Sequence, residues 1–433
     1  MKILLAMPSF YRKDGTLFRE KKRLIIPITL PYLAGLTPRE CDIQIVDEHV
    51  APIDTSADYD LVGLSVLGAS ERRAIEVAQA FRRRGIKVVA GGIHASLAPE
   101  RLQEHVDSIV VGEAELVWRD VLADAQNGGL KPRYEADRLC EMKGLPMPRF
   151  DLLDMRQFRF DYYPVQTTRG CPHGCRFCEV NAIYGRKYRF RPISEVLAEI
   201  QALPGRNLHI VDDNIGGDTD RAKELFRGMI PLKVRWSGLT TFKSLRDEEY
   251  VRLAKQSGCF HLNLGIESVN PASLADVRKH HNRVDEYREL LQRLDHYKVP
   301  YSLNFILGLD EDTPETVDLT VDFCRRVKPH LAFFSMLTPR PGTELLRELA
   351  AERRIVHHNY DQYDWDEPVF KPLRMTAQQL KEGVWKCYDD FYSLPQIFRR
   401  FLAPPRPYLY RELFLSLFYW SAVRKRIDPV SFF

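Results

Sequence analysis

Short apolar runs alternate with amphipathic helical patterns through the first 126 residues of the chain. The clearest helical pattern spans 71–84 and keeps its apolar residues on one face. The apolar runs are predicted as buried strands, which cover residues 2–7, 42–46, 61–65, 87–90 and 108–111. This alternation predicts an α/β fold with a doubly wound parallel sheet, which binds ligands at the carboxyl ends of its strands.

A second β/α series occupies residues 164–342. Six β/α units predict a partial (β/α)6 barrel, with its active site at the C-terminal mouth of the strands. Residues 127–163 are rich in Pro and Gly and lack periodicity, so we interpret them as a linker. Residues 343–433 are predicted as a helical C-terminal region. The predicted barrel strands cover residues 164–168, 207–211, 233–237, 260–265, 301–307 and 332–337.

Composition and charge are those of an ordinary soluble globular protein. The formal net charge is +4 over 433 residues, so charge gives no support to a nucleic-acid partner. The apolar start of the chain is too short for a signal peptide and suits a buried strand better. The longest uncharged stretch near the end, 413–423, is too short to cross a bilayer. We therefore expect a cytoplasmic protein.

Three of the eight cysteines, Cys171, Cys175 and Cys178, lie within eight positions of one another, whereas the other five are scattered. Closely spaced cysteines on a loop can supply three corners of an iron–sulfur cubane. Three ligands in place of four leave one iron open, as an open coordination position does in a catalytic zinc site. The spacing therefore predicts a [4Fe–4S] cluster that binds a further ligand at its open iron.

Two other readings of the cysteines stay open at this point. Three buried thiols could share one helix face, but Gly170, Pro172 and Gly174 disfavour a helix. A zinc site would need a fourth ligand, for which His173 or Cys140 is available.

The Cys-x3-Cys-x2-Cys spacing, with Phe177 before the last cysteine and a predicted strand before the first, resembles the radical S-adenosylmethionine (SAM) superfamily. The resemblance implies that Cys171, Cys175 and Cys178 ligate the cluster and that its open iron binds SAM. It also implies cleavage of SAM to a 5′-deoxyadenosyl radical, with an external electron donor of the flavodoxin or ferredoxin type.

The resemblance extends to the ends of two later strands. It implies that Asp212, Asp213 and Asn214 bind the amino group of SAM, and that Glu267 and Ser268 belong to the same site. Alternatively, the two aspartates cap the helix that starts near residue 220. A buried Glu267 carboxylate would be costly unless it were paired. The basic run of Arg186, Lys187, Arg189 and Arg191 is interpreted as a solvated face outside the site.

Residues 89–100 and 110–115 resemble the cobalamin-binding domain that is fused to many radical SAM enzymes. Gly91 and Gly92 would let the backbone approach the cofactor closely. The Asp-x-His-x2-Gly motif that ligates cobalt from below is absent, which leaves His94 as a candidate ligand; a structural hydrogen bond is its alternative role. Further candidate contacts in these loops are Gly68, Ser96 and Glu113.

The segments 164–171, 184–187 and 211–214 resemble the branch of the superfamily that contains hopanoid and bacteriochlorophyll methylases. This resemblance implies a methyltransferase that acts on an unactivated carbon of a small-molecule or lipid-like substrate through methylcobalamin. The alternatives are a radical oxidoreductase or cyclase without methyl transfer, and a non-catalytic sensor. The aromatic tail 408–433 either makes a peripheral contact with a membrane or packs on the barrel as a helix.

Overall fold

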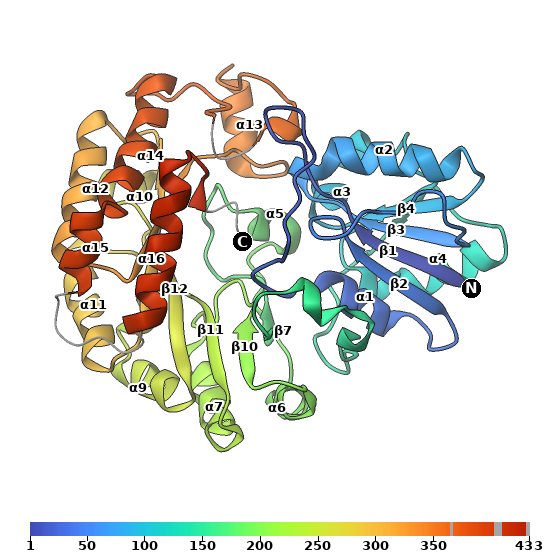
Figure 1. Ribbon diagram of the computed structural model, residues 1–433, viewed down its shortest axis with the longest axis horizontal. Coiled ribbons are helices and arrows are strands. Elements are labelled where there is room, and N and C mark those ends of the chain that lie inside the picture. Colours follow the sequence, from blue (N-terminus) through green and yellow to red (C-terminus); the bar gives the residue numbers. More distant parts are fainter. Residues whose placement is uncertain (364–366, 402–408, 430–433) are drawn as a thin grey trace. The chain divides into compact units, whose positions relative to one another are not determined.

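The computed structural model describes residues 1–363, 367–401 and 409–429 (Figure 1). The chain forms two compact units. Unit 1 holds Met1–Asp161, Ala182–Tyr184 and a short segment that begins at His358. Unit 2 holds Tyr162–Asn181, Gly185–His357 and the described remainder of the chain.

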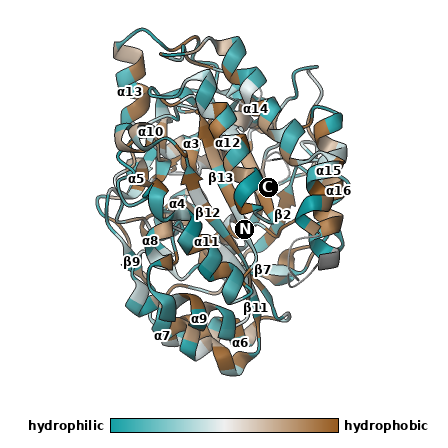
Figure 2. Ribbon diagram, turned by 90° about the vertical axis from the view of Figure 1, so that its left-hand side faces the viewer, coloured by the Kyte–Doolittle hydropathy of each residue, from teal (hydrophilic) through white to brown (hydrophobic). Residues whose placement is uncertain are grey.

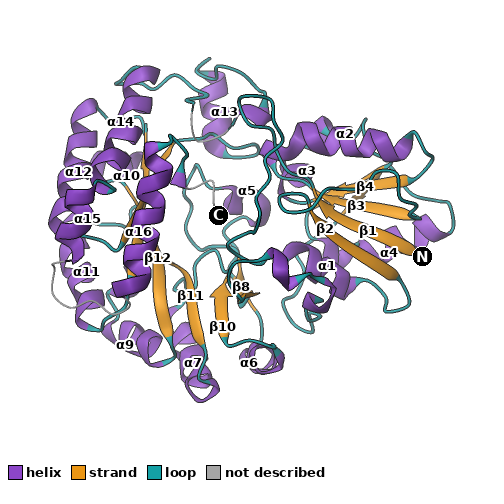
Figure 3. Ribbon diagram, in the orientation of Figure 1, coloured by secondary structure: helices purple, strands orange, loops and turns teal. Residues whose placement is uncertain are grey.

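Unit 1 is built on a six-stranded parallel sheet in the order β2-β1-β3-β4-β5-β6 (Figure 3). This is the strand order of flavodoxin-like doubly wound folds with one strand added. The strands are β1 (Lys2–Met7), β2 (Asp42–Asp47), β3 (Leu61–Ser65), β4 (Lys87–Gly91), β5 (Ser108–Val111) and β6 (Arg133–Glu135). The helices are α1 (Thr29–Leu36), α2 (Glu71–Arg82), α3 (Ile93–Leu97) and α4 (Trp118–Gln126).

Both faces of this sheet are buried, because alternate strand residues enter two separate cores. Leu4 and Val62 pack with Phe81 of α2 in one core, and Leu5 and Val89 pack with α1 and α4 in the other. Burial on both faces explains the continuous apolar runs of the sequence. The prediction of a doubly wound parallel sheet is confirmed.

The segment 127–163, interpreted from the sequence as a linker, is part of the unit 1 fold up to Asp161. It contributes β6, which pairs with β5 at the edge of the sheet. Its three-residue strand is too short for a periodicity to be visible in the sequence.

Unit 2 is a parallel sheet whose six strands lie in chain order, from β7 at one edge to β14 at the other. The two edge strands do not pair with each other within the described residues, so the barrel is open and the predicted partial (β/α)6 barrel is confirmed. The strands are β7 (Tyr162–Val165), β10 (Asn207–Ile210), β11 (Arg235–Thr240), β12 (Cys259–Glu267), β13 (Tyr301–Leu307) and β14 (Leu331–Met336).

The helices that connect the strands cover one side of this sheet (Figures 1 and 3). Trp236 of β11 stacks on Phe226 of α7 (Thr219–Met229) at a ring-centroid distance of 5.0 Å, and Phe334 of β14 meets Tyr388 of α14 (Ala377–Phe391) at 5.2 Å. Alternate strand positions on the other side carry polar residues, among them His209 and Ser237, which hydrogen-bond at 3.0 Å. The connecting helices include α6 (Ile193–Ala202), α7 (Thr219–Met229), α9 (Glu248–Gln256), α11 (Tyr287–His296) and α12 (Pro314–Val327).

The C-terminal region is helical, as predicted, and teal and brown residues mix along its helices in Figure 2. In the last helix Ser416, Tyr419 and Val423 are buried, and Tyr419 packs on Phe333 of β14. This contact corresponds to the packed alternative for the tail, although Tyr408 and 430–433 lie outside the described residues. No described helix has the length and hydropathy of a membrane span. The helices are α13 (Glu344–Ala351), α14 (Ala377–Phe391), α15 (Leu394–Phe401) and α16 (Leu409–Arg424).

Candidate active site

The three clustered cysteines lie on a loop of unit 2 that leaves the first strands of the barrel. The predicted strand 164–168 is split into β7 and a short β8 (Thr168–Arg169), which pairs antiparallel with β9 (Arg189–Phe190). Gly170, with φ of 88°, then turns the chain into the loop. The loop ends at α5 (Glu179–Tyr184), whose N-cap is Cys178.

The geometry of this loop favours the cluster over both alternatives. Residues 171–178 are not helical, so the cysteines do not share a helix face. A tetrahedral zinc ion would hold its sulfurs within about 4 Å of one another. Among the described residues, the three cysteine sulfurs do not form such a compact group, whereas Glu113, Glu115 and Cys140 do, with ligand atoms within 4.8 Å. In a cubane, each thiolate binds a different iron and the sulfurs stay further apart.

Burial disfavours the thiolate form of the three cysteines. It raises the pKa of Cys171, that of Cys175 to about 11 and that of Cys178 to about 12. Three neutral thiols at neutral pH become thiolates only with a cationic partner, and iron supplies that charge. Asn214, which is 1% exposed, directs its amide nitrogen at the Cys171 sulfur at 4.0 Å.

Asp212 and Asp213 join the end of β10 to the start of the cysteine loop. One Asp212 oxygen accepts hydrogen bonds from the backbone N–H groups of Thr167 and Thr168 at 2.6 and 2.9 Å. Asp213 accepts from the N–H of Gly170 at 2.9 Å. The capping alternative is wrong, because Asp218 caps α7. Asp212 therefore acts on the site by holding the chain that leads to Cys171.

We predict that Asp212→Ala lowers the free energy of unfolding by about 2–4 kcal/mol, because two buried N–H groups lose their acceptor. Asp218→Ala is the matched control, since it removes only a helix cap and costs about 1 kcal/mol. Urea unfolding of both variants, followed by circular dichroism, measures the difference. Equal losses in the two variants would contradict the role given to Asp212.

Glu267 ends β12 and forms a buried ion pair with Lys279. Its backbone lies in the left-handed region, with φ of 61°, beside an irregularity in the pairing of β12 with β13. Such strained positions concentrate at functional sites. Burial would lower the pKa of Lys279, but the charge of Glu267 raises it above its ordinary value. A buried ammonium thus lies beside the cysteine loop.

No motif in the sequence points to the segment that brings Lys279 to the site. His281 of the same segment stacks on His173 of the cysteine loop, with ring centroids 3.6 Å apart. Asn282 donates to the carbonyl oxygens of Gly265 and Ile266, which anchors the segment to β12. His281 and His173 are more than 100 residues apart in the sequence, so no local motif could predict their contact.

The basic run after α5 was expected to be a solvated face, and this is wrong for Arg191. Its side chain is buried, pairs with Glu199 at 2.7 Å and donates to the Gln166 carbonyl. Arg186 is exposed but lies against the cysteine loop, since a Cβ on Gly174 would be 2.6 Å from its guanidinium carbon. Arg186 is therefore part of the surroundings of the site.

Unit 1 offers an apolar edge at the carboxyl ends of its strands. Leu67, which follows β3, and Ile93, the first residue of α3, are 45% and 36% exposed. Gly68 and Gly91 leave room there, because a Cβ on either would meet its nearest neighbour only at 3.7–3.8 Å. Glycine is required at position 92 for the fold of unit 1, because φ is 96° and an added Cβ would lie 3.0 Å from the Val66 backbone. A flat macrocycle with apolar faces suits this edge.

His94 is buried in unit 1 and hydrogen-bonded to a carboxylate. It is 1% exposed, and its Nε2 hydrogen-bonds Glu71 at 2.5 Å. Burial would raise the pKa of Glu71, but the hydrogen bonds from His94 and Arg101 hold it below its ordinary value. Tyr360 packs edge-on against the imidazole at 5.3 Å. The geometry corresponds to the structural alternative for His94 and not to a cobalt ligand.

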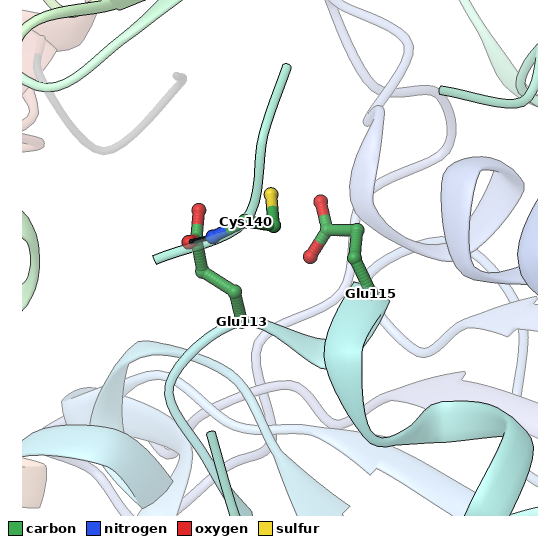
Figure 4. A group of neighbouring side chains, drawn as sticks. All are labelled: Glu113, Glu115 and Cys140. Carbon is green, nitrogen blue, oxygen red and sulfur yellow. Dashed lines mark hydrogen bonds between the residues drawn. The ribbon is translucent and has the colours of Figure 1, made fainter. Parts of the chain in front are cut away.

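Ser96 and Glu113 each accept a hydrogen bond from the backbone of another segment of unit 1. Ser96 accepts from the Gly112 N–H at 3.0 Å, and Glu113 accepts from the Cys140 N–H at 2.6 Å. Figure 4 shows Glu113, Glu115 and Cys140 side by side, with the hydrogen bond that joins the first to the last. Glu113 thereby fastens the segment after β6 to the end of β5.

Two domain families match the chain. Residues 165–324 match the radical SAM superfamily, and residues 22–122 match the B12 binding domain. The first match contains the cysteine loop and β10–β13, and the second contains most of the unit 1 sheet. Together the matches reproduce the order of the two units.

The chain aligns with named relatives over most of their length. The chain is 29% identical to the bacteriochlorophyllide d C-12(1)-methyltransferase of Chlorobaculum tepidum, over 96% of this chain and 92% of the relative. It is 25% identical to the hopanoid C-2 methylase of Rhodopseudomonas palustris, over 94% and 82%. Among solved structures, the radical SAM methyltransferase TsrM of Kitasatospora setae has the same fold, with a TM-score of 0.69, 16% identity and coverage of 98% and 99%.

Proposed function

The chain belongs to the radical SAM superfamily, with a B12-binding domain ahead of the barrel, and from this premise we propose that it methylates an unactivated carbon of an organic substrate. The observation that carries the proposal is the presence of both cofactor domains in a chain that aligns almost end to end with named methyltransferases. A [4Fe–4S] cluster, SAM and cobalamin are its cofactors.

The residues of unit 2 suit the cluster and SAM. Cys171, Cys175 and Cys178 would hold the cluster, with Phe177 between the last two. Lys279 places a buried positive charge beside them, which favours binding of thiolates and of an anionic cluster. Asp213, Asn214, Glu267 and Ser268 lie at the ends of β10 and β12, where the polar groups of SAM would bind.

Unit 1 suits cobalamin through its apolar edge, where Leu67 and Ile93 would contact the macrocycle. His94 is hydrogen-bonded to Glu71, so we do not propose it as a ligand of cobalt. When bound, the cofactors supply an electron, a 5′-deoxyadenosyl radical and a methyl group. The chain's own task is to orient them and to exclude water and other hydrogen donors.

The substrate is proposed to be a small organic or lipid-like molecule that carries polar groups. The named relatives act on bacteriochlorophyllide d and on hopanoids. In this chain, the side of the barrel sheet away from the connecting helices carries hydrogen-bonding residues, including His209 and Ser237 and the pair Asn263 and Ser302. Such a lining favours a substrate with polar groups over a plain hydrocarbon. A peripheral membrane contact of the tail stays a prediction.

Transfer of a labelled methyl group tests the proposed function without knowledge of the substrate. Anaerobically reconstituted protein is incubated with reduced cobalamin and methyl-labelled SAM. We expect the label in the bound corrinoid, and an organic product that gains labelled methyl in extracts of cells expressing the protein. The matched control is the triple Cys171→Ala, Cys175→Ala, Cys178→Ala variant, which should yield no labelled product.

The outcome separates the proposed function from its alternatives. Deoxyadenosine release without label in corrinoid or product would indicate a radical oxidoreductase or cyclase. Cofactor binding without deoxyadenosine release would indicate a sensor. Either result removes the methyl-transfer proposal.

A further inference from the structure

Three exposed cations lie on two segments of unit 2, one of which contacts the cysteine loop. Arg186 lies against Gly174 of that loop, and Lys187 follows it in the sequence. Lys243 belongs to α8 (Phe242–Leu245) and is exposed. We call Arg186, Lys187 and Lys243 the basic rim.

Direct packing links the two segments that carry the basic rim. A Cβ on Gly217 would lie 2.6 Å from the Tyr188 ring, and a Cβ on Gly216 would lie 2.5 Å from the Ser244 Cβ. The two glycines therefore join the segment after α5 to α8. Because Tyr188 and Ser244 are next to Lys187 and Lys243 in the sequence, the rim residues share one region of unit 2.

The basic rim carries charge without counter-ions. Arg186, Lys187 and Lys243 are all exposed, and none forms an ion pair within the part of the chain that the structure describes. Neighbouring cations differ, since Arg246 pairs with Glu286 at 2.6 Å and Lys223 pairs with Asp247 at 2.8 Å. Uncompensated cations project a positive potential into solvent and attract acidic partners.

Cleavage of SAM at the cluster consumes one electron that must arrive from outside the chain. Electron tunnelling weakens steeply with distance, so a donor has to dock near the loop that holds the cluster. Arg186 of the basic rim lies against this loop at Gly174, and His173 of the same loop stacks on His281. The charge of the rim and its place beside the loop define one kind of partner.

We propose that the basic rim is the docking surface for an acidic one-electron donor protein of the flavodoxin or ferredoxin type. The inference rests on the proposed function, because it assumes that the cysteine loop carries the cluster. On docking, the donor is oxidised by one electron and the cluster is reduced by one electron, with no bond formed or broken. Opposite charges accelerate the encounter and orient the donor toward the loop.

The test compares two reductants on the reconstituted holoenzyme. The rim variant is Lys187→Glu with Lys243→Glu, which leaves Arg186 in place against the cysteine loop. The matched control is Arg288→Glu with Arg326→Glu, two exposed cations on α11 and α12 that form no ion pair in the described chain. Stopped-flow absorbance measures reduction of the cluster by reduced flavodoxin and, separately, by dithionite.

With flavodoxin at low ionic strength, we expect the rim variant to be reduced about tenfold or more slowly than wild type and the control variant. With dithionite all three proteins should react alike, because a small reductant needs no docking surface. Added salt should slow the wild-type reaction with flavodoxin and leave the rim variant nearly unchanged. Calorimetric titration with oxidised flavodoxin should show the same order of affinities.

Equal flavodoxin rates for the rim and control variants would overturn the proposal, as would a wild-type protein that flavodoxin does not reduce. A slow rim variant with both reductants would also overturn it, since the substitutions would then act on the cluster. Failure of the proposed function is visible separately. It would appear as wild-type protein that assembles no cluster, or that is reduced normally and transfers no methyl label.

Discussion

Replacing Cys175 with alanine is expected to abolish cleavage of SAM and to leave cobalamin binding unchanged. Cys175 is 8% exposed, and its carbonyl accepts from the Cys178 N–H at 3.2 Å, so the residue forms the centre of the cysteine loop. Each thiolate of the loop would bind a separate iron, and two ligands do not hold a site-differentiated cubane. Unit 1 has its own cores and does not depend on this thiol.

Two measurements on the same anaerobic preparation check this expectation. Iron content and deoxyadenosine release should fall to the background of the assays, whereas a cobalamin absorbance titration should match wild type. Cys41→Ala is the control, because Cys41 is half-buried in unit 1 and distant in sequence from the loop. Deoxyadenosine formation by Cys175→Ala would refute the cluster assignment.

The fold was predictable because strands and amphipathic helices alternate in both units, and because the unit 1 sheet is buried on both faces, which leaves continuous apolar runs in the sequence. The strand expected at 301–307 coincides with β13, and the helix expected at 71–84 contains α2. The prediction failed where a strand was short. Neither β6 nor the break between β7 and β8 has enough residues to produce a periodic signal.

The candidate site was predictable only where its residues are adjacent in the chain. The three cysteines and the run Asp212–Asn214 stand out as local patterns, and the structure brings them together through Thr167 and Gly170. A local sequence pattern does not show which acidic residue accepts hydrogen bonds from backbone N–H groups. The bonds from Thr167 and Thr168 to Asp212 were therefore not predicted. Lys279 was missed for the same reason, since its partner Glu267 lies 12 residues earlier, across α10 (Pro271–Asp276).

Replacement of Lys279 with methionine is expected to lower the free energy of unfolding by about 3–5 kcal/mol, because it leaves the Glu267 carboxylate buried without a counter-charge. The two side chains are 7% and 10% exposed, so water screens the pair little. Gly265 packs closely on the pair, since a Cβ there would lie 3.0 Å from the Lys279 nitrogen. Little space is therefore available for water to replace the ammonium.

The double variant Lys279→Met with Glu267→Met separates the lost charge balance from lost packing. Removal of both charges should recover much of the stability, because an apolar pair of similar volume is often as stable as a buried ion pair. Urea unfolding of the three proteins without cofactors gives the two differences. Iron bound after reconstitution should fall in both variants, because each lacks the buried cation beside Cys175. If the double variant were no more stable than the single one, the pair would matter for packing alone, and the electrostatic role of Lys279 would be refuted.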